Sequence, residues 1–226
     1  MKTIAMITAR GGSKRIPRKN VLPFCGKPII LYSIQAALES GIFDEVMVST
    51  DDEEIARIAT QAGAKVPFMR SEKTSNDFAS TADVIMEVIE EYQKRGEEFA
   101  YVCCIYPTAP FITAEKLRTA YARLSETDAD ALIPVVRFSY PPQRALVMRD
   151  ERLVFNMPEF MLSRSQDLDP WYHDAGQFYF LRTESFLRTG KLMEGEILPF
   201  EVSEMEVQDI DTMTDWELAE LKYQRM

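Results

Sequence analysis

Continuous apolar runs alternate with segments of helical periodicity along most of the chain. Apolar runs of this length are typical of strands buried on both faces. Buried strands are predicted at residues 3–9, 45–50, 65–69, 99–106, 131–136 and 176–181. Helices are predicted at residues 28–41, 51–64, 81–96, 113–126 and 214–226, with Pro28 at position N1 of the first and Gly41 at its end. This β-α-β-α alternation predicts an α/β fold of three layers with a mainly parallel sheet.

The regular alternation stops between residues 137 and 170. This segment is rich in Pro, Met and Arg and has no helical period. Its apolar side chains, among them Phe138, Tyr140 and Phe155, favour an ordered insertion over a disordered excursion. The chain has no repeats, low-complexity tracts or linker, so a single domain over 1–226 is predicted.

Composition narrows the class of partner. The chain has 226 residues and a formal net charge of −10, which argues against nucleic acid or an anionic membrane as partner. Cys25, Cys103 and Cys104 have no metal-binding spacing, so reduced thiols in a cytoplasmic protein are expected. The apolar run at 3–9 is too short for a secretory leader, and no long apolar span follows.

One early loop opposes the overall charge. Residues 8–20, TARGGSKRIPRKN, contain five basic residues and no acidic one: Arg10, Lys14, Arg15, Arg18 and Lys19. The loop directly follows the first strand, and Gly11-Gly12 allow the backbone to approach a ligand closely. Cations and free amide groups suit a phosphate ligand. A solvated basic loop is the alternative, and the sequence matches neither the P-loop nor the GxGxxG pattern.

Two aspartates precede the last predicted helix. Asp209 and Asp211 are two residues apart, and on an extended backbone alternate side chains point the same way. Both carboxylates could then reach one hard cation such as Mg²⁺, which prefers oxygen ligands. In the alternative, one of them or Asp215 caps the helix.

Several stretches resemble a known family. ITARGGSKRIPRKN, FCGKPIILYSI, VSTDDEEIA, YPTAPF and DIDTMTDW occur in this order and resemble the motifs of cytidylyltransferases that activate eight- and nine-carbon acidic sugars. The stretches IYPTAPF, RSQDL and YHDAGQFYF are most similar to the branch that acts on pseudaminic acid. The resemblance covers nearly the whole chain. It implies a Rossmann-like nucleotidyltransferase fold, transfer of CMP from CTP to the anomeric hydroxyl of a nonulosonic acid, release of pyrophosphate, and Mg²⁺ as cofactor.

The resemblance also implies roles for individual residues around the nucleotide. Arg10, Lys19 and Asp211 are expected to serve catalysis, and Asp209 to join Asp211 at the metal. The nucleotide-binding set is Arg10, Gly11, Gly12, Ser13, Lys19, Asn20, Arg70, Asp77, Ser80 and Thr81. From the residues alone, Ser80 or Thr81 could equally be a helix N-cap and Asp77 a turn residue.

The implied sugar site lies later in the chain. Tyr106 stands where sialic acid enzymes commonly have Gln, which favours a less hydroxylated sugar, although it could simply belong to the core. His173, Asp174 and Gln177 coincide with the acceptor-sugar region, and Arg164 could pair with the sugar carboxylate or with a neighbouring aspartate. Residues 137–175 match the position of an inserted dimerisation segment, which implies a homodimer. A sialic or legionaminic acid synthetase, a glycosyltransferase and a nucleotide sensor remain the alternatives.

Overall fold

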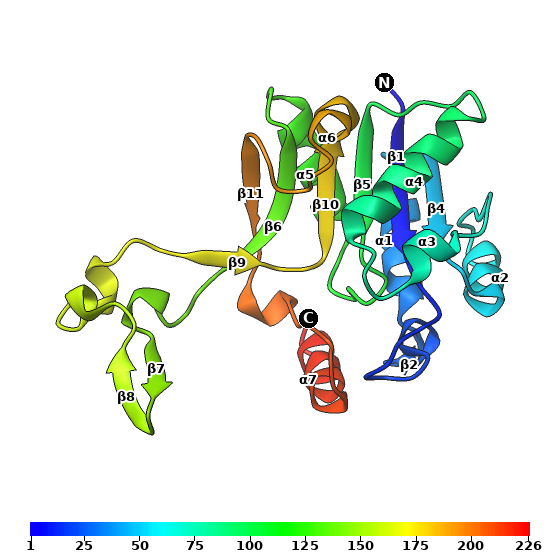
Figure 1. Cartoon of the computed structure of the whole chain (residues 1–226). Coiled ribbons are helices and arrows are strands. Elements are labelled where there is room, and N and C mark those ends of the chain that lie inside the picture. Colours follow the sequence, from blue (N-terminus) through cyan, green and yellow to red (C-terminus); the bar gives the residue numbers. More distant parts are fainter.

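A seven-stranded sheet forms the centre of the protein, whose structure, a computed structural model, describes residues 1–226. Its main strands are β1 (Thr3–Thr8), β4 (Glu45–Ser49), β5 (Tyr101–Ile105), β6 (Ala131–Arg137), β10 (Phe178–Arg182) and β11 (Ile197–Glu201). They lie in the order β11-β6-β10-β5-β1-β4 (Figure 1), and β10 alone runs antiparallel to both of its neighbours. The mainly parallel sheet predicted from the sequence is therefore confirmed.

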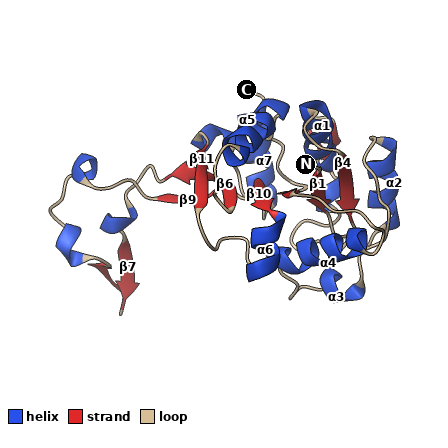
Figure 2. Ribbon diagram, turned by 90° about the horizontal axis from the view of Figure 1, so that it is seen from above, coloured by secondary structure: helices blue, strands red, loops and turns tan.

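Helices cover both faces of this sheet (Figure 2). They are α1 (Ile30–Ser40), α2 (Glu53–Gln61), α3 (Glu72–Ser75), α4 (Thr81–Gln93), α5 (Ala114–Ser125), α6 (Thr183–Thr189) and α7 (Met213–Tyr223). Side chains alternate along β1, so Ala5 and Ile7 pack beneath α1, α2 and α5, whereas Ile4 and Met6 pack beneath α4 and α6. Continuous apolar strands result because both faces are buried.

Two local predictions are wrong. No strand spans 65–69: Lys65 makes a single bridge to Met47, and Pro67, two residues later, has no amide hydrogen. Pro28 is not at position N1, because it pairs in the small hairpin of β2 (Pro23–Phe24) and β3 (Lys27–Pro28), and α1 begins only at Ile30. Gly41 ends α1 in the left-handed conformation, as predicted.

The insertion leaves the sheet after β6 and projects away from it (Figure 1). It carries the hairpin β7 (Leu146–Arg149) and β8 (Arg152–Phe155), with 3-10 turns η2 (Pro142–Arg144), η3 (Pro158–Phe160) and η4 (Ser165–Asp167). It returns as β9 (Tyr172–Asp174), which pairs antiparallel with β6. We call residues 137–175 the arm. None of the helices in the chain has both the length and the apolar composition needed to span a membrane.

Candidate active site

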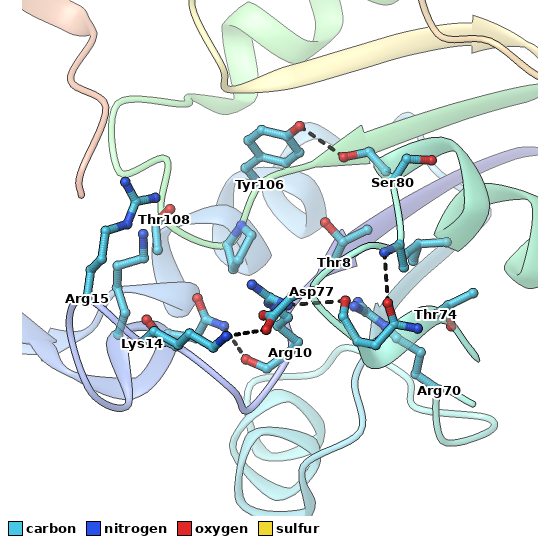
Figure 3. A pocket seen from close by; sticks show the side chains of 18 residues that line it. Thr8, Arg10, Lys14, Arg15, Arg70, Thr74, Asp77, Ser80, Tyr106 and Thr108 are labelled. Carbon is cyan, nitrogen blue, oxygen red and sulfur yellow. Dashed lines mark hydrogen bonds and ion pairs between the residues drawn. The ribbon is translucent and has the colours of Figure 1, made fainter. Parts of the chain in front are cut away.

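A cavity of about 580 Å³ opens where β1 and β5 end and α4 begins. Lys14 and Arg15 enter it from one side and Arg70 from the opposite side (Figure 3). The predicted nucleotide residues that line it are Arg10, Ser13, Lys19, Asn20, Arg70, Asp77, Ser80 and Thr81. Tyr106 forms part of its wall. The cavity lies at the carboxyl edge of the parallel strands, where ligands of such sheets bind.

Lys19 joins the basic loop to the two late aspartates. It begins the 3-10 turn η1 (Lys19–Val21), and its Nζ donates a hydrogen bond of 2.6 Å to the carbonyl oxygen of Ile210. The same nitrogen lies 4.0 Å from Oδ1 of Asp211. Burial lowers the pKa of Lys19, and the carboxylates of Asp211 and Asp209 oppose that effect. Two segments about 190 residues apart in sequence therefore meet at one side of the cavity.

Asp77 lies opposite two other cations of the loop. Nη1 of Arg10 donates to Oδ1 of Asp77 at 2.9 Å and to the carbonyl oxygen of Asn76 at 3.2 Å. Lys14 forms an ion pair with the second oxygen of the same carboxylate. These contacts, that of Lys14 foremost, lower the pKa of Asp77 and keep it ionised. The Asp77 carboxylate thus pairs with cations of the loop that is expected to bind phosphate.

The helix-capping alternative is confirmed for Asp215, which forms a capping box with Thr212, and is wrong for Asp209 and Asp211. Thr212 is the N-cap of α7, and Oδ2 of Asp215 accepts from the backbone nitrogens of Thr212 at 2.7 Å and Asp211 at 3.1 Å. Ile210 is 2% exposed and packs in the core, so Asp209 and Asp211 flank a buried side chain and lie toward the surface. Neither carboxylate caps the helix, and Asp211 instead pairs with Arg15 at 2.5 Å.

This pair of carboxylates fits a magnesium ion. Mg²⁺ is usually held by one or two carboxylates together with substrate phosphates and water. The chain offers two such groups and no cluster of three His, Cys, Asp or Glu side chains that could hold a metal by itself. Asp209 forms no ion pair, whereas Asp211 pairs with Arg15, whose side chain is 67% exposed, and at 4.0 Å with Lys19. The donor set therefore suits a hard cation that shares its coordination with a nucleotide.

The opposite wall contains residues with structural duties. Arg70 is 7% exposed, and its guanidinium donates to Oγ of Ser49 at 2.9 Å and to the Ser49 carbonyl oxygen at 2.6 Å. Ser80 is the N-cap of α4 and forms a capping box with Asp83, as the alternative interpretation predicted. The hydroxyl of Thr81 lies 3.1 Å from that of Tyr106. These side chains are therefore held by contacts within the chain.

A second cavity, of about 290 Å³, lies on the other side of Tyr106. Asp174, Tyr179 and Asp209 line it. The ring of Tyr179 packs edge-on against Tyr106, with centroids 5.4 Å apart, and its hydroxyl donates to Oδ2 of Asp174 at 2.6 Å. Sequence reasoning missed Tyr179, although β10 places its side chain on the opposite face from Phe178 and Phe180. Tyr106 thus separates a nucleotide-sized cavity from a smaller one.

Other predicted residues lie away from both cavities. Gln177 is 2% exposed, and its Nε2 donates to the Glu206 carbonyl oxygen at 2.5 Å, so its side chain is a buried part of the structure. His173 is exposed and packs against Phe138. Arg164 is exposed on the arm and lines neither cavity of its own chain.

The two glycines of the basic loop also lie outside the cavity lining. The Gly11 amide donates to Oδ1 of Asp51 at 2.8 Å. A Cβ on Gly11 would lie 2.8 Å from Oδ2 of Asp52, whereas one on Gly12 would meet nothing within 4 Å. Close packing against Asp52 therefore explains the first glycine, and the second has no such constraint.

A three-layer α/β sheet with a cationic loop after its first strand, which lines a cavity and contacts a late segment with two carboxylates, is characteristic of a nucleotidyltransferase. The chain belongs to the cytidylyltransferase family, whose model matches residues 4–225. It is 43% identical over 224 residues to pseudaminic acid cytidylyltransferase of Campylobacter jejuni subsp. jejuni serotype O:2, which covers 99% of this chain and 97% of that protein. It is 31% identical over 227 residues to CMP-N,N'-diacetyllegionaminic acid synthase of Legionella pneumophila, covering 97% and 95%.

A solved structure shares the fold. CMP:2-keto-3-deoxy-manno-octonic acid synthetase, complexed with CTP, matches 100% of both chains with a TM-score of 0.73 at 22% identity. The family assignment makes this protein an enzyme of nucleotidyl transfer and disfavours the glycosyltransferase and sensor alternatives.

Proposed function

We propose that the enzyme transfers CMP from CTP to the anomeric hydroxyl of pseudaminic acid and releases pyrophosphate. The observation that carries this proposal is the position of Lys19, whose ammonium lies at the cavity between the basic loop and the Asp209–Asp211 segment. The identity to the Campylobacter jejuni enzyme supports pseudaminic acid as the sugar. Tyr106 supports the same choice, because an aromatic wall suits a sugar that lacks hydroxyl groups.

The chain's own residues would act mainly by positioning and by neutralising charge. Arg10, Lys14 and Lys19 can exchange their present oxygen partners for the phosphate oxygens of CTP. They would then stabilise the negative charge that builds on pyrophosphate as it leaves. Asp209 and Asp211 would hold Mg²⁺, which when bound neutralises phosphate charge and lowers the pKa of a coordinated hydroxyl.

The smaller cavity is the proposed place of the acceptor sugar. It adjoins the nucleotide cavity at Tyr106 and Thr108, so a hydroxyl in one could approach a phosphate in the other. The Tyr179 hydroxyl holds the carboxylate of Asp174 at its wall. Asp174 also accepts the amide hydrogen of Gly176 at 2.8 Å, so its orientation is fixed from two sides. A carboxylate held rigidly there could accept hydrogen bonds only from sugar hydroxyls in the matching orientation, and would thus select for sugar stereochemistry.

We further propose a homodimer that the arm helps to form. Large apolar side chains on the arm are exposed in the single chain: Tyr140 by 88%, Met148 by 73%, Leu153 by 64% and Leu162 by 89%. Such a group of apolar side chains is typical of an interface. In the dimer, Arg164 would serve the site of the other subunit. Light scattering at micromolar concentration tests this, and a monomer would contradict it.

The thiols support a reducing compartment, and we propose the cytoplasm. Cys103 and Cys104 are buried and unpaired, and burial raises their pKa values, Cys104 to about 12. Such thiols stay protonated and unreactive.

Pyrophosphate release tests the reaction and the sugar together. The purified enzyme is incubated with each of the four nucleoside triphosphates and with pseudaminic, legionaminic and sialic acids, with and without Mg²⁺. We expect release only with CTP, fastest with pseudaminic acid, and dependent on the metal. Faster release with legionaminic or sialic acid would reassign the sugar, and release without any acceptor would contradict CMP transfer.

A further inference from the structure

We propose that Arg18 and Asp52 form a positioning pair that holds the basic loop in its triphosphate-binding shape without touching the nucleotide. This inference rests on the proposed function of the loop. Of the five cations in residues 8–20, Arg18 alone does not line the cavity. Its guanidinium instead faces Asp52, with Nη1 2.5 Å from Oδ2 and Nη2 3.2 Å from Oδ1, and it also pairs with Glu54.

The contact is a bidentate one, which fixes orientation as well as distance. The Asp52 side chain is only 19% exposed, and its Oδ1 accepts from the amides of Glu54 and Ile55 at 3.0 Å each. Asp52 is thereby the N-cap of α2 and is itself held in place. The loop is consequently tied to the start of a helix rather than to another mobile side chain.

The backbone of Arg18 shows what this tie maintains. Its φ of 59° is left-handed, a conformation that is unfavourable for a residue with a side chain. Its carbonyl oxygen accepts from the amides of Val21 at 3.0 Å and Leu22 at 3.1 Å, so the reversal at Arg18 begins the turn that carries Lys19. The direction in which the Lys19 side chain leaves the loop depends on this conformation.

The other end of the loop is fastened at the same place. The Gly11 amide donates to Asp51, and Gly11 packs so closely on Asp52 that a methyl group would collide with it. Two consecutive aspartates after β4 thus hold the two ends of the loop: Asp51 binds Gly11, and Asp52 binds Arg18. Lys14 and Arg15 lie between these anchors and face the cavity. Two anchors on one helix start define the shape of the span between them.

Preorganisation of this kind lowers the ordering cost of binding and maintains catalytic geometry. The two roles of Asp52 can be separated by substitution. Asp52→Asn retains a good N-cap but removes the ion pair. Arg18→Gln removes the charge from the other partner, and Arg18→Lys restores charge without bidentate geometry. Lys2→Gln is the matched control, because Lys2 forms an exposed ion pair with Glu97 outside the cavity.

The test measures kcat and KM for CTP and for the sugar, together with the shift in unfolding temperature that CTP produces. We expect Arg18→Gln and Asp52→Asn each to lower kcat/KM for CTP by about 10-fold or more, since small displacements of binding groups have effects of this size. The KM for the sugar and the unfolding temperature without ligand should stay close to wild type. The double variant should be no worse than either single variant, and Arg18→Lys should recover part of the loss.

Wild-type kcat/KM in Arg18→Gln, or losses that multiply in the double variant, would overturn the pairing. If Arg18→Gln and Asp52→Asn lower the unfolding temperature without ligand by as much as the unfolding temperature with CTP, the pair has only a structural role. If the wild-type enzyme releases no pyrophosphate from CTP, the proposed function fails. The CTP-induced shift in unfolding temperature still decides the inference in that case, because it supports the pair only if both variants reduce it.

Discussion

Replacing Lys19 by Met removes the ammonium group while retaining much of the apolar stem. The Lys19 side chain is 21% exposed, and its Nζ donates a hydrogen bond of 2.6 Å to the Ile210 carbonyl oxygen. The ammonium group therefore has two further hydrogens to donate to phosphate. A hydrogen bond to a charged group contributes about 1.5–3 kcal/mol. Loss of one such bond in the transition state corresponds to a fall in kcat/KM of about 10- to 150-fold. We expect Lys19→Met to lower kcat/KM for CTP within this range.

The assay is steady-state pyrophosphate release with CTP varied at saturating sugar, combined with urea unfolding of the same preparations. Lys65→Met is the matched control: Lys65 forms an ion pair with Glu45 at 2.6 Å outside the cavity, so its removal should leave kcat/KM unchanged. Activity of Lys19→Met within about threefold of wild type would refute the reasoning. Lys19 would then serve only to hold residues 209–211 against the loop.

Three other measurements follow from the same contacts. Burial lowers the pKa of Lys19 from its usual 10.5, so its positive charge is lost as pH rises through that lowered value. As pH rises, kcat/KM for CTP should therefore begin to decrease before pH 10.5 is reached. Lys19→Arg should move this decrease to higher pH. Thr212→Ala removes the N-cap of α7 and should cost about 1 kcal/mol in urea unfolding, with an unchanged Mg²⁺ titration. Tyr106→Gln should shift the ratio of kcat/KM values from pseudaminic towards sialic acid, and an unchanged ratio would return Tyr106 to a core role.

Local patterns carried much of the fold. β1, β4, β5 and β6 appear where continuous apolar runs occur, because each is buried on both faces. The direction of β10 could not be predicted in this way, since its burial pattern is the same for a parallel or an antiparallel neighbour. The β7–β8 hairpin has no turn signal in the sequence. Its turn residues Asp150 and Glu151 adopt left-handed conformations, a position where Asn-Gly or Asp-Gly is the usual sequence.

The site was predictable where topology determines it. Parallel strands end at one edge, which predicts the basic loop after β1 and Tyr106 after β5 at the same edge; the two are neighbours because β1 pairs with β5. Long-range packing was not predictable. Asp52 carries the sequence signal of a helix cap, which hides its contact with Arg18. Gln177 is polar and lies in a stretch that suggests a site residue, yet its side chain is buried and its amide donates to the carbonyl oxygen of Glu206.

The carboxylates around residues 8–20 explain how an acidic protein maintains a dense basic loop. Asp77 and Asp211 neutralise cations that line the cavity, whereas Asp52 neutralises the one that does not. A triphosphate can replace the first two partners, because its oxygens bind the same donors and carry more charge. It cannot replace Asp52, which is fixed as a helix cap. The cations paired with Asp77 and Asp211 can therefore bind the substrate, whereas Arg18 maintains the shape of the loop. Only the first group should change partners when an anionic ligand binds.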